Sequence, residues 1–317
     1  MQLRPFRQGD EDELVRLWNQ RMTGCFATPP ITPEIFLRDV TGKHYFDPEG
    51  LVLVFDSGRL VAFVHAGFKS KDWITPDPRQ GTISMLVVEK HHIEAGVVAI
   101  RQGIRYLLRC GARQIEAFTI DFPHTPFYNG LYGGEKAGMD EDHPLGLALM
   151  KRTCFQPASG GVIMTCDLDC AIHPAPPLDG LDLRVEEWQS PIAGLKAADC
   201  YGIPERVRRA RLVDANGVEK AGITFWHLDR YNQATGDRLA VVSHVGSVES
   251  IRGSGAPVAL QREVHRILSG EGARRMALGT GGANGRAVSF YRKAGYRVLR
   301  NAWTFYLDWN AYDEVTR

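Results

Sequence analysis

The sequence predicts an α/β (α+β) protein built from two copies of one β-α-β-β-β-α-β-α-β unit. The first observation is that apolar segments with strand or helix spacing follow one another in the same order before and after residue 180. The second is that Gly-Ala-Arg ends the long predicted helix of each half, starting at Gly111 and at Gly272. A shared order of elements together with a shared tripeptide is typical of a duplication.

The duplication sets the expected domain organisation. The run His-Pro-Ala-Pro-Pro-Leu-Asp-Gly at 173–180 is typical of a proline-stiffened linker between domains. We therefore expect an N-terminal domain at 1–170, a linker at 171–180 and a C-terminal domain at 181–317.

In the first copy, each element is expected from its apolar spacing. Leu3 opens a short strand, and apolar residues from Leu14 to Trp18 recur at helical spacing behind three acidic residues that suit a first helical turn. Asp-Ser-Gly at 56–58 joins two apolar runs as a hairpin. A long amphipathic helix is expected at 96–110. Further strands are expected at 51–55, 60–68, 82–88, 114–120 and 162–169, with a loop and short helix within 29–43 and a helix at 145–152.

The second copy repeats this order. Leu183 opens a strand as Leu3 does, and Asn216-Gly217 forms a favoured two-residue turn between the next two strands. The strands are expected at 211–213, 219–227, 239–248, 275–278 and 303–309, and the helices at 258–268 and 287–293.

Composition limits the class of protein. The chain has 317 residues, 44% of them hydrophobic and 24% charged, with a formal net charge of +1. This balance favours neither nucleic-acid binding nor binding to a membrane surface. We see no secretory signal at the start and no apolar run of the roughly 20 residues needed to span a bilayer. Six cysteines without a disulfide spacing suit a reducing compartment, so we expect a cytoplasmic protein, monomeric or homodimeric.

The turn Arg252-Gly253-Ser254-Gly255-Ala256 is the main candidate for a functional site. It lies between a predicted strand and a predicted helix, so its backbone N–H groups fall at a helix N-terminus. Its two glycines let a ligand approach the backbone without interference from a Cβ atom. Amides of a first helical turn and the helix dipole favour a phosphate group there.

The second copy resembles the Gcn5-related N-acetyltransferase (GNAT) superfamily over roughly 181–309. The glycine turn is similar to the family's Gln/Arg-x-x-Gly-x-Gly/Ala pyrophosphate loop, although Pro257 stands where the family has its last Gly or Ala. A second segment is similar to the family's Asn-x-x-Ala-x-x-Phe-Tyr-x-x-x-Gly-Phe pattern. It matches at Asn284, Ala287, Phe290, Tyr291 and Gly295, with Tyr296 in place of the usual Phe.

This resemblance implies a fold and an activity. The chain looks like a tandem GNAT protein, an architecture also found in mycothiol synthases, with two mixed, mostly antiparallel sheets flanked by helices. The implied activity is direct transfer of an acetyl group from acetyl-CoA to a primary amine, with no metal. The acceptor stays open among small-molecule amines, aminoglycosides, polyamines and protein N-termini. A non-catalytic acyl-CoA-binding module and transfer of a different acyl group are the alternatives.

The resemblance also implies roles for individual residues. Tyr291 is the expected acid for the departing thiolate, and its alternative is a core tyrosine. Asn284 is expected to contact the pantetheine arm or the loop, and its alternative is a helix N-cap. The candidates for a general base are His244 and Glu249, and the favoured alternative for each is a structural or solvated residue. The expected cofactor contacts are Ser247, Val248, Arg252, Gly253, Ser254, Gly255, Ala256, Asn284 and Tyr291.

The first copy has lost these residues. Counting back from the shared Gly-Ala-Arg places His91 to Gly96 opposite the glycine turn, and Met150 falls opposite Tyr291. We therefore expect a degenerate, non-catalytic N-terminal domain. It also carries an insertion at 122–143 whose aromatic and glycine residues either line an acceptor site or pack structurally. A zinc interpretation of Cys166, Cys170 and His173 lacks a fourth ligand, and burial in a strand explains Cys166 better.

Overall fold

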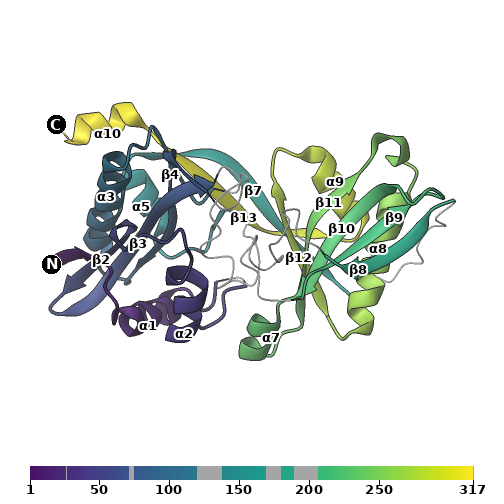
Figure 1. Cartoon of the computed structure of the whole chain (residues 1–317), viewed down its shortest axis with the longest axis horizontal. Coiled ribbons are helices and arrows are strands. Elements are labelled where there is room, and N and C mark those ends of the chain that lie inside the picture. Colours follow the sequence, from purple (N-terminus) through teal and green to yellow (C-terminus); the bar gives the residue numbers. More distant parts are fainter. Residues whose placement is uncertain (26, 71–74, 120–137, 169–179, 189–205, 317) are drawn as a thin grey trace. The chain divides into compact units, whose positions relative to one another are not determined.

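The computed structural model describes residues 1–25, 27–70, 75–119, 138–168, 180–188 and 206–316. These residues form two compact units (Figure 1). Unit 1 consists of residues 1–161 and 302–317, and unit 2 consists of residues 162–301.

The sheet of unit 1 has the strand order β1-β2-β3-β4-β5-β13. Its pairs are antiparallel, apart from β4 and β5, which run parallel. The sheet is therefore mixed and mostly antiparallel. Its strands are β1 (Gln2–Pro5), β2 (Leu51–Asp56), β3 (Arg59–Ser70), β4 (Pro76–Val88), β5 (Gln114–Ala117) and the end of β13 (Arg297–Leu307), which also pairs with the short β6 (Met139–Asp140).

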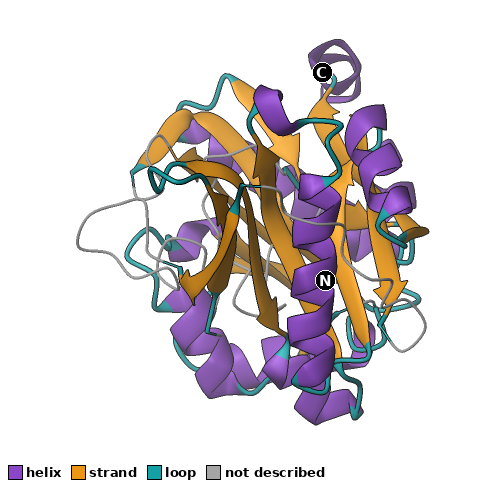
Figure 2. Cartoon of the chain, turned by 90° about the vertical axis from the view of Figure 1, so that its right-hand side faces the viewer, coloured by secondary structure: helices purple, strands orange, loops and turns teal. Residues whose placement is uncertain are grey.

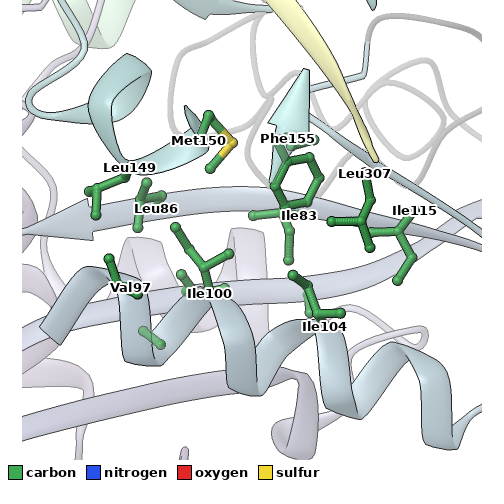
Figure 3. Packing of buried hydrophobic residues seen from close by; sticks show 14 of the residues in the cluster. Ile83, Leu86, Val97, Ile100, Ile104, Ile115, Leu149, Met150, Phe155 and Leu307 are labelled. Carbon is green, nitrogen blue, oxygen red and sulfur yellow. The ribbon is translucent and has the colours of Figure 1, made fainter. Parts of the chain in front are cut away.

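Helices cover both faces of this sheet, and neighbouring residues of β3 pack on opposite faces. Val64 and its neighbours belong to a cluster with α3 (Ile93–Arg109) and α5 (Gly146–Arg152). Figure 3 shows other side chains of this cluster, among them Ile100 of α3 and Leu149 of α5. Phe63 packs in a second cluster with α1 (Glu11–Arg21) and α2 (Pro33–Phe36), which leads into a π-helical turn at Leu37–Thr41. A 3-10 turn at Pro48–Gly50 precedes β2, and α10 (Trp309–Thr316) closes the unit.

The sheet of unit 2 has the strand order β7-β12-β11-β10-β9-β8. Strands β8 to β11 pair antiparallel, whereas β11 and β12 pair parallel, as β4 and β5 do in unit 1. The strands are the end of β7 (Phe155–Asp167), β8 (Asp182–Glu187), β9 (Arg208–Val213), β10 (Glu219–His227), β11 (Leu239–Ser247) and β12 (Arg275–Gly281). Figure 2 shows the strands in orange and the helices beside them in purple.

The helices of unit 2 are α7 (Asp229–Thr235), α8 (Ala256–Gly270) and α9 (Gly285–Lys293), with a 3-10 turn at Glu249–Ile251 before α8. Leu260, Val264 and Leu268 of α8 form an apolar stripe at helical spacing, which packs in one cluster with Ile223 and Phe225 of β10. Burial of this stripe holds α8 against the sheet and fixes the position of its N-terminus.

The compact units differ from the predicted domains at two strands. The end of β13 belongs to unit 1, although its sequence lies in the second copy, and the end of β7 belongs to unit 2. There Thr165 Oγ1 donates a 2.9 Å hydrogen bond to the Met276 carbonyl of β12. The divisions at 170 and 181 therefore do not describe these segments. The expected linker at 171–180 lies outside the described residues, apart from its last residue.

Several elements differ from the sequence prediction. The last strand, expected at 303–309, begins at Arg297 and ends at Leu307, and Trp309 opens a helix instead. The short helix α7 was not predicted. The strand expected at 114–120 spans only Gln114–Ala117. Most of the expected insertion at 122–143 lies outside the described residues.

Hydrogen-bonded charged side chains connect β9 and β10 to the end of α8. Glu271, the residue after α8, accepts two 2.6 Å hydrogen bonds from Arg208 of β9, and His227 Nε2 lies 2.9 Å from the same carboxylate. Its hydrogen bonds to Arg208 lower the pKa of Glu271 to about 2 from its ordinary value of 4.5, and His227 adds to the effect. The Arg208 guanidinium also stacks 4.6 Å above the Phe225 ring.

The lowered pKa of Glu271 predicts how the free energy of unfolding changes as the pH falls. Because the pKa of Glu271 is lower in the folded state, its stabilisation is complete above about pH 4.5 and is lost as the pH falls toward 2. We expect Glu271→Gln to lower the free energy of unfolding at pH 7 and to flatten its decline between these values. Urea unfolding at a series of pH values tests this, with Glu263→Gln as the control for an exposed ion pair on α8. An unchanged pH slope in Glu271→Gln would contradict it.

Among the described residues, no helix has the length and apolar character that crossing a membrane requires. The cytoplasmic location stays a prediction.

Candidate active site

The parallel strands β11 and β12 part at one edge of unit 2. They pair over three residues only, from Leu239 with Arg275 to Val241 with Ala277. Beyond that point β11 continues to Ser247 beside β10, and β12 continues to Gly281. The carboxyl ends of two parallel strands therefore diverge here, leaving the β12-facing backbone of β11 without a strand partner. In open α/β sheets, ligands bind at such edges.

Strand β11 has a bulge at the same edge. Thr224 of β10 pairs with Ser243, and Gly222 pairs with Gly246, so β11 contains one extra residue between these pairs. His244 lies in the bulge with a left-handed φ of +48°. This conformation is uncommon for a residue other than glycine and is often associated with functional sites. Its ring is held by Ser243, whose Oγ lies 2.9 Å from Nδ1.

The Arg252–Ala256 loop follows β11 and begins α8. Gly253 and Gly255 both have left-handed φ values, +84° and +91°, and Gly255 is the N-cap residue of α8. A Cβ atom at Gly253 would meet no heavy atom within 4 Å, so the space beside its backbone is open. Glycine is therefore required at both positions by the turn itself, and it also leaves room for a ligand at Gly253.

The loop leaves several backbone donors available. The N–H groups of Arg252 and Ser254 donate to carbonyls of the preceding 3-10 turn, and that of Ala256 donates to Ser254 Oγ at 3.2 Å. The amides of Gly253, Gly255 and Val258 have no protein acceptor among the described residues, and Pro257 has no N–H. Three unused donors at the start of a 15-residue helix are suited to an anion.

Of the other predicted cofactor residues, Ser247 and Val248 precede this loop closely in the chain, and Asn284 lies at the start of α9. Ser247 ends β11, and its carbonyl accepts a 3.2 Å hydrogen bond from Arg252 Nη2. The Val248 N–H donates to the Lys220 carbonyl at 2.8 Å, so this amide is already in use and the exposed side chain is what Val248 offers a ligand. Asn284 caps α9 by accepting a 3.1 Å hydrogen bond from the Ala287 N–H. The N-cap alternative for Asn284 is thus realised.

Tyr291 lies on α9 and is buried, with 7% of its surface exposed. Its ring packs edge-on against Phe290 at 5.2 Å and against Tyr296 at 5.7 Å. Burial raises the pKa of Tyr291 to about 12, so the phenol is protonated at neutral pH. Its hydroxyl has no hydrogen-bond partner among the described residues, and it is therefore available to a ligand.

The two candidate bases lie on either side of the end of β11. Desolvation by neighbouring atoms lowers the pKa of His244, and the positive charge of Arg209 lowers it further, so both effects favour the neutral imidazole. Glu249 opens the 3-10 turn, and its side chain is exposed. A neutral imidazole in the bulge is able to accept a proton.

Gly222 lies against an ion pair beside this bulge. A Cβ there would press against Arg209 Nη2 and Glu219 Oε1, which are 2.5 Å apart, whereas a Cβ at its strand partner Gly246 would meet nothing within 4 Å. We expect Gly222→Ala to lower the free energy of unfolding by up to about 1 kcal/mol, because the added methyl group displaces the ends of two flexible side chains and weakens a partly exposed ion pair, and Gly246→Ala to change it by less than about 0.5 kcal/mol. Urea unfolding of both variants tests this, and equal losses would contradict it.

Unit 1 contains no equivalent of the glycine loop among its described residues. Its long helix α3 has 17 residues and begins at Ile93 after His92, two residues earlier than counting back from Gly-Ala-Arg predicts. The N-cap residue that corresponds to Gly255 is therefore His92, not Glu94. Met150, the predicted counterpart of Tyr291, is fully buried in the apolar cluster with Leu149 and Phe155 (Figure 3).

Sequence reasoning missed two features of the site. The bulge at His244 leaves no local signal, because it arises from pairing between β10 and β11. Gln261 and His265 are fully buried on α8, and their spacing of four residues on the apolar stripe was a signal that could have been used.

Comparisons with known proteins identify the fold. No protein-family model and no curated protein matches the sequence. Among solved structures, the GCN5-related glucosamine N-acetyltransferase region of a fungal multi-domain GH3 β-N-acetylglucosaminidase matches with a TM-score of 0.65 at 14% identity. That match covers 96% of this chain and 38% of the fungal chain.

Two further structures match over nearly the full length of both chains. A tandem GNAT protein from the clavulanic acid biosynthesis pathway has a TM-score of 0.63 at 15% identity, covering 96% of this chain and 97% of that one. A GCN5-related N-acetyltransferase from Sphaerobacter thermophilus has a TM-score of 0.61 at 16% identity, with coverage of 96% and 94%. The chain therefore has the fold of the GCN5-related N-acetyltransferases, as the motifs of its second half predicted.

Proposed function

We propose that unit 2 is an N-acetyltransferase that uses acetyl-CoA as co-substrate and transfers the acetyl group directly to a primary amine. The observation that carries this proposal is the parting of β11 and β12 at the edge where the Gly253–Gly255 loop begins α8. Binding groups for a diphosphate and for a thioester are then adjacent in the chain. The fold shared with GCN5-related acetyltransferases supports the same conclusion.

The loop would hold the pyrophosphate of acetyl-CoA. Its support is the set of unused amides at Gly253, Gly255 and Val258 together with the open space beside Gly253. The N-terminal end of α8 carries about half a positive charge, which favours the phosphates. Beyond the loop, Ser247, Val248 and Asn284 are the residues that we assign to the pantetheine arm.

Different residues of the chain would carry out the separate steps of the reaction. Backbone N–H groups of β11 that have lost β12 as a partner would donate to the thioester carbonyl and polarise it. The amine nitrogen forms a bond to the carbonyl carbon as the carbon–sulfur bond breaks. Tyr291 gives its proton to the departing sulfur, and the proton lost by the amine passes to His244, Glu249 or water. The products are an amide and free CoA.

Two measurements test the proposed function. Calorimetry should show acetyl-CoA binding to the full chain. A screen of small amines, polyamines, aminoglycosides and peptides, read as release of the CoA thiol, should find an acceptor. Binding without release across the screen would favour a non-catalytic acyl-CoA-binding protein, and absence of binding would contradict the assignment of the loop.

A further inference from the structure

Three polar side chains are buried within the apolar cluster of unit 2. Gln261 and His265 belong to α8, and Tyr296 follows Gly295 at the end of the α9 segment. Their exposed fractions are 0%, 2% and 3%. Because burying a polar group is unfavourable unless it is hydrogen-bonded, such a cluster requires an explanation.

The three side chains meet at the Tyr296 hydroxyl. Gln261 Nε2 lies 2.9 Å from this oxygen and His265 Nε2 lies 3.2 Å from it. Gln261 Nε2 and His265 Nε2 are themselves 3.1 Å apart. The His265 and Tyr296 rings pack with their centroids 5.4 Å apart. We call these three residues the Gln261–His265–Tyr296 network.

Part of the hydrogen-bonding capacity of the network is unused. Gln261 Oε1 and His265 Nδ1 are buried without a hydrogen-bond partner among the described residues. An unpaired buried polar atom costs free energy, whereas apolar side chains of similar shape would avoid that cost. Phe is also the usual residue of the GNAT pattern at the position of Tyr296. A role other than stability is therefore the better explanation for the polar residues.

Tyr296 is in direct contact with Tyr291. Their rings pack edge-on with centroids 5.7 Å apart, and the Tyr296 N–H donates a 2.9 Å hydrogen bond to the Tyr291 carbonyl. The chain turns between them at Gly295, whose φ is +97°. Since Gln261 and His265 hold the other end of the Tyr296 side chain, the network joins α8, which begins at the glycine loop, to the ring of Tyr291.

We propose that Gln261, His265 and Tyr296 are positioning residues that hold the Tyr291 ring in one orientation relative to α8. The proposal rests on the proposed function only in taking Tyr291 as the proton donor. Apolar packing alone lets a ring rotate and shift, whereas hydrogen bonds with two side chains of α8 fix the neighbouring Tyr296 ring in place. Small displacements of a catalytic group have large effects on rate.

Kinetics of a double-mutant cycle test the proposal. We expect Tyr296→Phe to lower kcat about tenfold while leaving the KM for acetyl-CoA within about twofold. In a Tyr291→Phe background, the same substitution should have no further effect on kcat, because the residue that it positions is already disabled. A loss of kcat that persists in full in that background would overturn the proposal. Gln261→Met serves as the second variant if Tyr296→Phe does not fold.

Nuclear magnetic resonance of ¹³C-labelled tyrosine tests the network without turnover. We expect the ring resonances of Tyr291 to shift, and its ring flips to become faster, in Tyr296→Phe and Gln261→Met. Tyr106→Phe is the matched control, because Tyr106 is a buried tyrosine of unit 1 that loses one 2.8 Å hydrogen bond, to Asp47. Unchanged Tyr291 resonances in both network variants would overturn the proposal. If no amine is acetylated, the proposed function fails, while this measurement still decides the network.

Discussion

Tyr291→Phe is expected to lower kcat for acetyl transfer by about 100-fold or more, the size of effect typical of a lost general acid. Negative charge develops on the CoA sulfur as it departs, and Tyr291 offers it a phenol whose hydroxyl is not engaged by another described residue. Burial raises the pKa of Tyr291 to about 12, so the proton is present throughout the neutral range. Binding of acetyl-CoA should stay within about twofold of the wild type, because the phosphate contacts are elsewhere.

The measurement is the rate of CoA thiol release with the acceptor found in the screen, together with calorimetry of acetyl-CoA binding. Tyr306→Phe is the control, since Tyr306 is 47% exposed on β13. The thermal stability of Tyr291→Phe should be close to that of the wild type, because no hydrogen bond among the described residues is lost. Full activity of this variant would show that Tyr291 is a core tyrosine, the alternative that its contacts with Phe290 and Tyr296 would then explain.

Elements with a strong local signal were predicted well. The strand at 219–227 has the predicted bounds, because its apolar run begins shortly after the Asn216-Gly217 turn. The helix expected at 258–268 spans Ala256–Gly270, since the stripe through Leu260, Val264 and Leu268 marks it clearly. By contrast, α7 buries none of its residues, so it has no apolar stripe to indicate a helix.

Features that depend on distant pairing could not be predicted. The sequence order of β7 and β13 gives no indication that the end of each strand joins the other unit's sheet, because that choice is made by pairing with β12 and β5. In the candidate site, too, some features follow from local sequence and others depend on strand pairing. The left-handed glycines of the loop follow from the residue types, whereas the His244 bulge depends on the register between β10 and β11.

The match of Asn284 to the GNAT pattern does not by itself establish a role in binding pantetheine. The GNAT pattern correctly indicated the helix that begins here, and the structure shows its oxygen capping Ala287 N–H. A capped helix N-terminus accounts for an Asn at this position without any ligand. The role of Asn284 toward pantetheine is therefore still a prediction, whereas its role in starting the helix that carries Tyr291 is a finding.

Gly255→Glu is expected to weaken acetyl-CoA binding about 100-fold or more, and to abolish measurable turnover with it. The substitution places a carboxylate at the N-cap of α8, where the amides of Gly253, Gly255 and Val258 are proposed to meet the pyrophosphate. Repulsion between like charges a few ångströms apart amounts to about 1–4 kcal/mol near a protein surface, depending on the effective dielectric. About 2.7 kcal/mol corresponds to 100-fold in affinity.

Backbone strain must be separated from charge in this experiment, because Gly255 has a φ of +91° and any side chain there is disfavoured. Gly236→Glu provides the control. Gly236 ends α7 with a φ of +72°, and a Cβ there would meet nothing within 4 Å. It therefore adds the same charge and a similar strain to unit 2 away from the loop. Gly255→Ala supplies the strain at the site without the charge, and it should weaken binding much less than Gly255→Glu. If Gly255→Glu binds acetyl-CoA as tightly as Gly236→Glu does, the pyrophosphate is held somewhere other than at the start of α8.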